Sequence, residues 1–288
     1  MSSLRVVHAN NVSVVIEGVI LRHAIPRNCK LGDVQANLAR MNDLARRISR
    51  KEVDVLCYPE LVTTGYSLGQ KWVELAETVP GPTTDKLGQV AREFGFHLIA
   101  GISERDPESG RIFNSAVLIN SEGEVAGAHR KVHLWDEERR YFTPGNEFKV
   151  FKTKVGTLGI GICYDLEFPE TSRILALCGA EILFFPSAEM RPYENHVDTC
   201  VRSRATENTV FVCFSNTIGR EGQTVFFGHS QIVSPACRVL AKAKASESYV
   251  IARLDLDSIQ KQRTTSPYLQ QRAPSAYGAL QSAWSQAN

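Results

Sequence analysis

One cysteine at the end of an apolar segment offers the clearest chemistry in this sequence. Residues 159–163 form an apolar run that ends at Cys163, and the chain becomes polar immediately afterwards. A strand ending there would present its thiol at a strand-to-helix corner, which suits a nucleophile because only an accessible thiolate attacks well. The alternative is a small buried cysteine, since unpaired cysteine is among the most buried residue types. The cysteine alone would favour this structural interpretation.

Two other segments place a carboxylate and an ammonium at equivalent positions. Residues 53–58 are typical of a buried strand that Pro59 ends, so Glu60 lies where the strand gives way to a loop. Lys131 follows another strand-like stretch. Strand ends at one edge of an α/β sheet are where functional sites form. We therefore expect Glu60, Lys131 and Cys163 to converge.

These segments resemble the carbon–nitrogen hydrolase family, also called the nitrilase superfamily, from about residue 31 to about residue 277. The motifs that carry the resemblance are Pro59-Glu60, Arg130-Lys131-Val132-His133-Leu134 and Cys163-Tyr164-Asp165. Their order and the gaps of 71 residues from Glu60 to Lys131 and 32 residues from Lys131 to Cys163 are ordinary for the family. Three further segments are family-like: Val79-Pro80-Gly81-Pro82, Phe142-Thr143-Pro144-Gly145 and Arg204-Ala205-Thr206-Glu207-Asn208.

The resemblance implies a reaction through a cysteine thioester. Cys163 is the expected nucleophile, and Glu60 is the general base that takes its proton. A neighbouring cation lowers the pKa of a cysteine, and Lys131 would supply one. Lys131 and the backbone N–H of Tyr164 are expected to stabilise the oxyanion, typically by about 3–4 kcal/mol for each donor. This mechanism needs no metal and no organic cofactor.

A second glutamate is expected to assist Lys131. Many family members carry one a few positions beyond the lysine, just before an aromatic-Thr-Pro-Gly-like segment. Glu138 occupies this place, and Glu137 is the competing assignment. The expected role is to hold Lys131 by a charge-assisted hydrogen bond and to help place the substrate. The alternative is that this acidic and basic run is a solvated loop.

The residues after the cysteine look like the amidase branch of the family, whereas true nitrilases usually have Cys-Trp-Glu there. The leading function is an amidohydrolase that cleaves a small-molecule carboxamide to a carboxylate and ammonia. The alternatives are the same chemistry on a nitrile or an N-carbamoyl amine, or a catalytically silent binding module. The presence of all three chemical residues argues against the last. Expected substrate-binding residues are Tyr66, Ala188, Glu189 and Met190, and Arg191 or Glu194 could also contact a charged substrate end.

The composition of the chain limits its domain number, its classes of partner and its compartment. With 288 residues, 43% of them hydrophobic, and no linker or composition break, the chain is expected to form one domain over residues 1–288. It would include an N-terminal extension of about residues 1–12 and a C-terminal tail of about residues 256–288 that contacts a partner subunit. A net charge of +2 without a basic stripe argues against nucleic-acid binding, and no apolar run has membrane-spanning length. Seven cysteines without a CxxC pair argue against a disulfide framework or zinc site and favour the cytoplasm.

Strand and helix signals alternate along the chain. Paired strands between helices suggest two sheets with helices outside, and the resemblance implies an α/β fold, the four-layer α-β-β-α sandwich of the nitrilase superfamily. It also implies a homodimer or larger homo-oligomer that pairs through helices near the site. Helices are expected at residues 34–51, 84–94, 169–178 and 195–207. Strands are expected at residues 13–21, 53–58, 97–103, 112–120, 124–130, 148–153, 157–163, 182–186, 210–216 and 231–233.

Some polar residues are better interpreted as structural. His129 and His133 stand four residues apart, like metal ligands on a helix. The sequence has no HExxH pattern, however, and this segment is typical of a strand end and loop, so structural histidines are expected. Asp165 and Arg173 are candidates for an ion pair across the first turns of the helix that follows Cys163.

Overall fold

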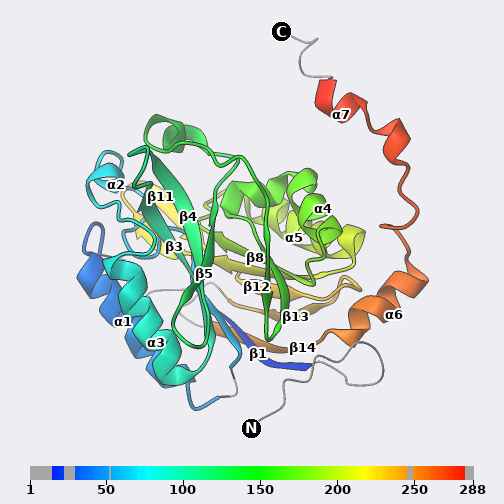
Figure 1. Ribbon diagram of the computed structural model, residues 1–288, viewed down its shortest axis with the longest axis horizontal. Helices are drawn as coiled ribbons and strands as arrows, with labels where there is room; N and C mark the ends of the chain where they lie inside the picture. The colour runs from blue at the N-terminus through cyan, green and yellow to red at the C-terminus, as the bar shows by residue number, and fades with distance from the viewer. Residues whose placement is uncertain (1–14, 23–29, 52, 245–248, 283–288) are drawn as a thin grey trace.

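Two six-stranded sheets form the centre of the protein in the computed structural model (Figure 1). The structure describes residues 15–22, 30–51, 53–244 and 249–282, so the expected N-terminal extension lies outside the described residues. The first sheet has the strand order β14 (Tyr249–Asp255), β1 (Val15–Arg22), β2 (Val55–Cys57), β3 (His97–Arg105), β4 (Ile112–Ile119) and β5 (Val125–Arg130). The second has the order β13 (Val239–Lys242), β12 (Gln231–Val233), β9 (Phe211–Asn216), β8 (Ile182–Ser187), β7 (Gly156–Ile160) and β6 (Val150–Thr153).

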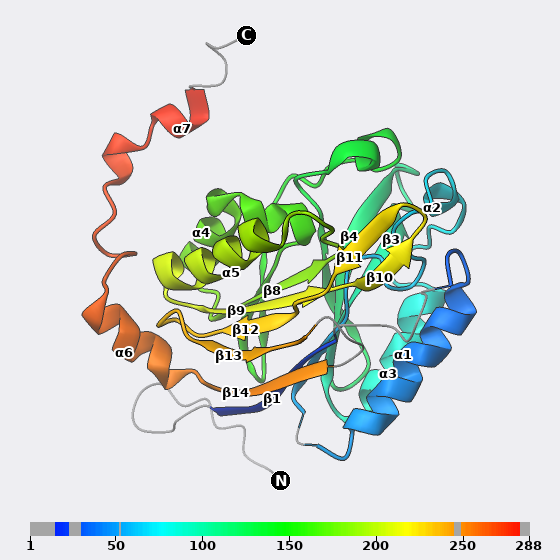
Figure 2. The ribbon, with the colours of Figure 1, turned by 180° about the vertical axis from the view of Figure 1, so that it is seen from behind.

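Helices cover the outer face of each sheet (Figures 1 and 2). Alternate strand residues face opposite ways: Val55 and Cys57 pack between the sheets, whereas Leu56 packs in the core under the outer helices. Separate apolar cores therefore fill the space between the sheets and beneath each helix pair. The chain forms the expected four-layer α-β-β-α sandwich. The outer layers are α1 (Val34–Ile48) with α3 (Pro82–Phe94), and α4 (Pro169–Leu177) with α5 (Glu194–Asn208).

Local sequence signals set the helix ends. The Asp33 side chain caps α1 by accepting a hydrogen bond of 3.0 Å from a first-turn N–H. Pro82 occupies the first turn of α3, where its missing N–H costs no hydrogen bond, and Gly95 ends that helix with a φ of 75°. α4 likewise begins at Pro169, directly after the turn that follows β7. The start of α4 therefore marks the end of the turn that begins at Cys163.

Strand direction brings the site residues to one edge. β1, β2 and β3 run parallel, and because β4 is antiparallel to both of its neighbours, β5 runs in the same direction as β3. In the second sheet β7, β8 and β9 are parallel. Glu60, Lys131 and Cys163 therefore each follow the carboxyl end of a strand, namely β2, β5 and β7.

The structure differs from the sequence-based prediction in two places at the edge where β2, β5 and β7 end. β7 ends at Ile160, and a 3-10 helix, η2 (Cys163–Glu167), begins at the cysteine, so the expected strand to residue 163 is wrong. The sequence also does not predict the hairpin of β10 (Ile218–Glu221) and β11 (Thr224–Phe227), which lies beside the site. A short helix, α2 (Lys71–Glu74), lies near this edge as well.

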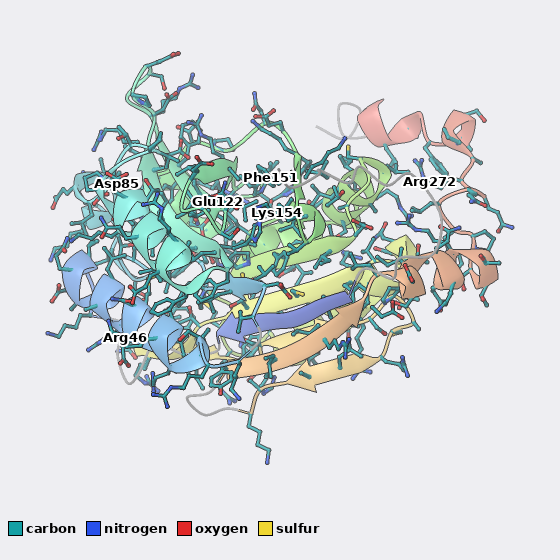
Figure 3. All side chains as sticks on the ribbon, turned by 60° about the horizontal axis from the view of Figure 1, so that its bottom comes forward. Arg46, Asp85, Glu122, Phe151, Lys154 and Arg272 are labelled. Carbon is teal, nitrogen blue, oxygen red and sulfur yellow. The ribbon has the colours of Figure 1, made fainter. Side chains whose placement is uncertain are left out.

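A surface ion pair and the C-terminal tail lie outside the two sheets and their covering helices. An exposed ion pair between Glu122 and Lys154 joins the turns after β4 and β6, one from each sheet (Figure 3). The C-terminal helices α6 (Asp257–Thr265) and α7 (Ala279–Ser282) extend beside α4 and α5, away from the sheets, with Arg272 between them (Figures 1 and 3). No helix in the described part of the chain is long and apolar enough to cross a membrane.

Candidate active site

Lys131 lies at the centre of a buried charged cluster. Its Nζ donates hydrogen bonds of 2.7 Å to Oε1 of Glu60 and to Oε1 of Glu138, and all three side chains are buried. Burial opposes the charged ammonium, but the charges of Glu138 and Glu60 raise the pKa of Lys131 well above its ordinary value. Lys131 therefore stays a cation between two carboxylates.

Glu138, and not Glu137, makes this contact. The 3-10 helix η1 (Asp136–Arg140) buries the Glu138 side chain, whose Oε1 also accepts a hydrogen bond of 2.7 Å from the Tyr66 hydroxyl. Its Oε2 accepts one of 3.2 Å from the backbone N–H of Trp135. Burial raises the pKa of Glu138 to about 7, although the neighbouring ammonium opposes this change. Glu137 is exposed.

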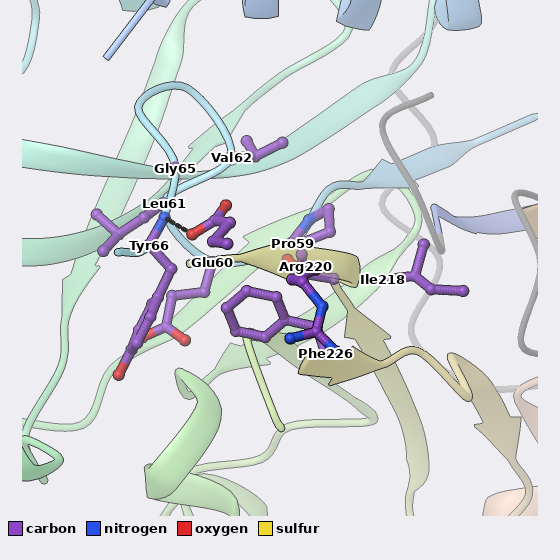
Figure 4. Close-up of a pocket in the computed structure, with 11 residues that line it drawn as sticks. Pro59, Glu60, Leu61, Val62, Gly65, Tyr66, Ile218, Arg220 and Phe226 are labelled. Atoms are coloured by element: carbon purple, nitrogen blue, oxygen red, sulfur yellow. Dashed lines mark hydrogen bonds between the residues drawn. The ribbon is translucent and has the colours of Figure 1, made fainter. Parts of the chain in front are cut away.

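Glu60 has one oxygen engaged and one without a partner. Its Oε1 accepts hydrogen bonds of 2.7 Å from Lys131 and from Asn114 Nδ2, whereas its Oε2 has no hydrogen-bond partner among the described residues. A cavity of about 20 Å³ adjoins Glu60 and is lined also by Tyr66 and Phe226 (Figure 4). That volume is enough for about one water molecule. The unpartnered oxygen can accept a proton.

The backbone after Glu60 is held against β3. Leu61 has a φ of 45°, in the left-handed region, and Gly101 packs directly against this turn. A Cβ on residue 101 would lie 2.3 Å from the Leu61 nitrogen and 2.7 Å from the Glu60 Cα. Only glycine fits there, so the sheet itself fixes the position of Glu60.

Cys163 begins η2 in an uncommon backbone conformation. Its φ is 47°, and its buried Sγ lies 3.4 Å from Oε1 of Glu189. Burial, followed by the charges of Glu189 and Glu60, raises the pKa of the Cys163 thiol well above its ordinary value. Lys131 opposes this change without overcoming it, so the expectation of a lowered thiol pKa is wrong. The resting thiol is protonated and needs a base.

Asp165 fixes the turn that carries the cysteine. Its Oδ2 accepts a hydrogen bond of 3.0 Å from the Ile162 N–H and lies 3.0 Å from His129 Nε2, and its Oδ1 lies 2.8 Å from His133 Nδ1. Burial alone would raise the pKa of Asp165, but the hydrogen bonds from both histidines hold it well below its ordinary value. The histidines are structural, as expected. The expected pair of Asp165 with Arg173 is wrong, because the histidines occupy this carboxylate.

A pocket of about 270 Å³ adjoins the thiol. The residues expected to bind substrate all line it, namely Tyr66, Ala188, Glu189 and Met190. Cys163 and Tyr164 also line it, as do Tyr193 and His196 from residues 187–196, a segment at the carboxyl end of β8 that the sequence predicts to line the pocket. Two further lining residues, Trp135 and Glu167, were not singled out from the sequence. Arg191 and Glu194 instead pair with each other at 3.0 Å and are not among the described lining residues.

Two supporting residues also escaped the sequence analysis. Asn114 interrupts the buried strand β4 with a polar side chain, which was a readable signal for a role beside Glu60. Glu221 accepts hydrogen bonds of 3.0 and 2.7 Å from the backbone N–H groups of Tyr66 and Ser67, the first drawn as a dashed line in Figure 4. Glu221 is 155 residues from Tyr66, so no local pattern marks it.

Known proteins share the sequence pattern and the fold of this chain. The family model described as carbon-nitrogen hydrolase matches residues 21–264. The chain belongs to this family. This carbon–nitrogen hydrolase is 33% identical over 257 residues to a probable nitrilase of Schizosaccharomyces pombe, covering 87% of this chain and 94% of that protein. It is 36% identical over 243 residues to an (R)-stereoselective amidase of a Pseudomonas species, covering 84% of this chain and 87% of that protein.

A solved amidase has the same fold as this hydrolase. The amidase from Nesterenkonia sp. AN1 has a TM-score of 0.79 and 26% identity, covering 93% of this chain and 98% of that chain. That structure is a variant showing covalent addition of the acetamide moiety of fluoroacetamide at the active-site cysteine. The assignment to the family from sequence motifs is confirmed, and the protein is an enzyme that hydrolyses carbon–nitrogen bonds.

Proposed function

We propose that the protein is an amidohydrolase that converts a small carboxamide to a carboxylate and ammonia through a thioester on Cys163. The observation that carries the proposal is the buried contact of Lys131 with Glu60 and Glu138, beside a pocket that the cysteine lines. The solved amidase with an adduct at its active-site cysteine supports a thiol nucleophile, and the related Pseudomonas protein supports an amide substrate.

The first half-reaction forms the thioester. Glu60 takes the thiol proton at Oε2 as the Cys163 Sγ attacks the amide carbonyl carbon. Negative charge develops on the carbonyl oxygen, where the Lys131 ammonium and the backbone N–H of Tyr164 stabilise it. Glu60 then gives its proton to the leaving nitrogen, the carbon–nitrogen bond breaks, and ammonia departs.

The second half-reaction hydrolyses the thioester. Glu60 removes a proton from a water molecule whose oxygen attacks the thioester carbon, and the carboxylate product leaves as the Cys163 sulfur regains a proton. Glu138 positions Lys131 through their hydrogen bond of 2.7 Å. Asn114 engages Glu60 Oε1 and so leaves Oε2 for proton transfer.

Ammonia release from a substrate panel tests this proposal. The panel contains propionamide, a 2-oxo-acid amide, an N-carbamoyl amino acid and a small nitrile, and we expect turnover of the carboxamides. Hydroxylamine should compete with water and trap the acyl group as a hydroxamate. Cys163→Ala should abolish turnover, and Glu60→Gln should slow both half-reactions, with a thermal melt to confirm that the variant is folded. Cys178→Ser, at an exposed thiol, is the matched control and should keep full activity.

Two results would contradict the proposal. Turnover of the nitrile or the N-carbamoyl compound without turnover of any carboxamide would replace it with one of those activities. Full activity in Cys163→Ala would remove the thioester from the reaction.

We also propose that the chain is a single domain that works as a homodimer or larger homo-oligomer in the cytoplasm. The two sheets share one apolar core, which supports a single domain. A reducing compartment suits a protein that depends on a free thiol. Large apolar side chains are exposed on α4 and on the C-terminal tail, which supports an interface there: Ile174, Leu177, Tyr268, Tyr277 and Leu280.

A further inference from the structure

Glu189 places a buried carboxylate in the pocket, and no described lysine or arginine forms an ion pair with it. The residue follows β8 and is only 6% exposed. Among the described residues, its carboxylate receives one hydrogen bond, of 3.4 Å from the Cys163 thiol. The lysine and arginine of this region pair with other carboxylates, Lys131 with Glu60 and Glu138, and Arg191 with Glu194. The His196 ring lies 2.7 Å from Glu167 Oε2.

The backbone holds Glu189 in this place. Its N–H donates a hydrogen bond of 2.7 Å to Asn216 Oδ1, and its carbonyl accepts one of 3.1 Å from Asn216 Nδ2. Asn216 is itself fully buried at the end of β9. These bonds fix the backbone from which the side chain extends, and the buried side chain lines the pocket.

An unpaired buried carboxylate lowers stability unless something compensates its charge. Burial and the charge of Glu167 raise the pKa of Glu189 to about 8, and Lys131 opposes the change. A cation bound in the pocket would supply the missing partner and would favour the ionised carboxylate.

The other walls of the pocket also suit positive charge. Four aromatic side chains line it, and the ring centroid of Trp135 lies 4.8 Å from that of Tyr164 and 5.9 Å from that of Tyr193. Aromatic faces attract cations. Glu167 contributes a second carboxylate, and the described lining residues include no lysine or arginine. A substrate with its own carboxylate would lie against two carboxyl groups here, with no lysine or arginine in the described lining to pair with it.

Distance sets where the positive charge must lie on the substrate. The carbonyl carbon has to reach the Cys163 Sγ, and Glu189 Oε1 is 3.4 Å from that sulfur. A nitrogen on the neighbouring carbon is about 2.5 Å from the carbonyl carbon, from two ordinary bond lengths. Its hydrogen bond to a carboxylate would add about 2.7–2.9 Å. A nitrogen one or two carbons from the carbonyl therefore fits between the two groups.

We propose that the substrate is a cationic amide, with a protonated amine one or two carbons from the carbonyl, and that Glu189 binds that amine. This inference rests on the proposed amidase function and names its substrate class. An amine of this kind is charged near neutral pH, because α-amino groups have pKa values of about 7.7–8.0. Glu189 then acts in substrate binding, whereas Glu60 carries the proton transfers.

Paired substrates of equal size test the inference. Glycinamide and propionamide differ in charge but hardly in shape, as do β-alaninamide and butyramide. At about pH 7 we expect kcat/KM for each cationic member to exceed that of its neutral partner by at least about 10-fold, mainly through KM. Glu189→Gln keeps the size of the side chain and should remove most of that ratio. Glu194→Gln, which removes a nearby carboxylate outside the pocket lining, should leave the ratio unchanged.

Binding provides a readout that does not need turnover. Calorimetry on Cys163→Ala should show tighter binding of glycinamide than of propionamide, and succinamate should bind least. Equal binding and equal turnover of the charged and neutral partners would overturn the inference while leaving the amidase function intact. Preferential binding of glycinamide without hydrolysis of any amide would overturn the amidase function and leave the binding of a cationic amide intact. An unchanged ratio in a folded Glu189→Gln would remove Glu189 as the amine's partner.

Discussion

At the residue scale, Lys131 is the cation that two buried carboxylates share. Lys131→Met keeps the apolar stem and removes the charge, so the oxyanion loses a donor. We expect kcat on propionamide to fall by at least about 100-fold while KM changes much less. Steady-state kinetics measure both constants, and a thermal melt separates lost chemistry from lost folding, because removing one partner of a buried ion pair also destabilises.

Lys131→Arg is the matched variant that keeps the charge. Its kcat should fall nearly as far as that of Lys131→Met, because a planar guanidinium cannot replace a compact ammonium held 2.7 Å from two carboxylates. Turnover at the normal rate by a folded Lys131→Met would contradict the role of Lys131 in the transition state.

Glu189 also makes stability depend on pH. Its pKa is about 8 in the folded protein against an ordinary 4.5, so the folded state holds the proton more tightly than the unfolded state. This stability is fully present below about pH 4.5 and is lost as pH rises through about 8. We therefore expect the free energy of unfolding of the wild type to fall between pH 5 and pH 8.5 by an amount on the order of a few kcal/mol. The melting temperature should fall over the same pH range.

Glu189→Gln should flatten this profile without removing it entirely. The pKa of Glu138 is also raised by burial, to about 7, and adds a slope of the same sign. Glu194→Gln, which removes a carboxylate outside the described pocket lining, is the control and should keep the wild-type slope. Parallel melting curves for the wild type and Glu189→Gln across this pH range would contradict the pKa assigned to Glu189.

The sequence predicted the residues that carry a local motif. Glu60, Lys131, Cys163 and Glu138 were found because each stands in a short recognisable segment, and the structure brings Lys131 into contact with both glutamates. Trp135 was missed because only the folded chain brings it to the same pocket as Cys163. The direction of the thiol pKa failed for the same reason: burial outweighs the nearby cation.

At the element scale, the loop Thr143-Pro144-Gly145 holds the backbone of Lys131 in place. Gly145 donates a hydrogen bond of 2.8 Å to the Lys131 carbonyl, and a Cβ on Gly145 would lie 2.2 Å from the Arg130 carbonyl oxygen. Backbone atoms cannot yield as a side chain can, so Gly145→Ala should displace the lysine. We expect kcat/KM to fall by at least about 10-fold, together with a lower melting temperature.

Gly278→Ala is the matched control for this change. No atom of the described residues lies within 4 Å of the Cβ that it would add, and its backbone is outside the left-handed region, so activity and melting temperature should match the wild type. Normal activity in Gly145→Ala would show that the loop does not position Lys131.

Element prediction succeeded where apolar runs are long and failed where they are short. α1, α3, β3 and β4 carry strong periodic or continuous apolar patterns and were located to within a few residues. β10 has only four residues and β14 exposes alternate residues, so neither stands out in the sequence. The expected strand to residue 163 was too long because residues 161 and 162 lead into the turn that Asp165 fixes.

At the scale of the whole molecule, the periodicity of apolar residues did not predict which strands pair with one another. β1 pairs with β14 from the other end of the chain, and β2 lies between β1 and β3. Such contacts join residues far apart in sequence, so only the resemblance to the family implied the sandwich. The same long-range pairing brings four strand ends, those of β2, β5, β7 and β8, to the site.

Assembly belongs to this scale as well. If copies of the chain pair through α4 and the tail, the exposed Ile174 and Leu177, at 40% and 46%, are buried in the interface. Light scattering should give at least about twice the chain mass of 32.0 kDa. The double variant Ile174→Asp and Leu177→Asp should be a monomer. Leu240→Asp, at a leucine of 38% exposure on β13, should keep the wild-type mass.

The same double variant should also lose activity, because α4 begins directly after η2, the turn that presents Cys163. Burying the outer face of α4 in a partner would hold that turn, and freeing it would let the thiol move relative to Lys131 and Glu60. We expect kcat/KM on propionamide to fall by at least about 10-fold in the monomer, with Leu240→Asp unchanged. A monomeric wild type, or a monomeric variant with full activity, would show that α4 supports the site without a partner.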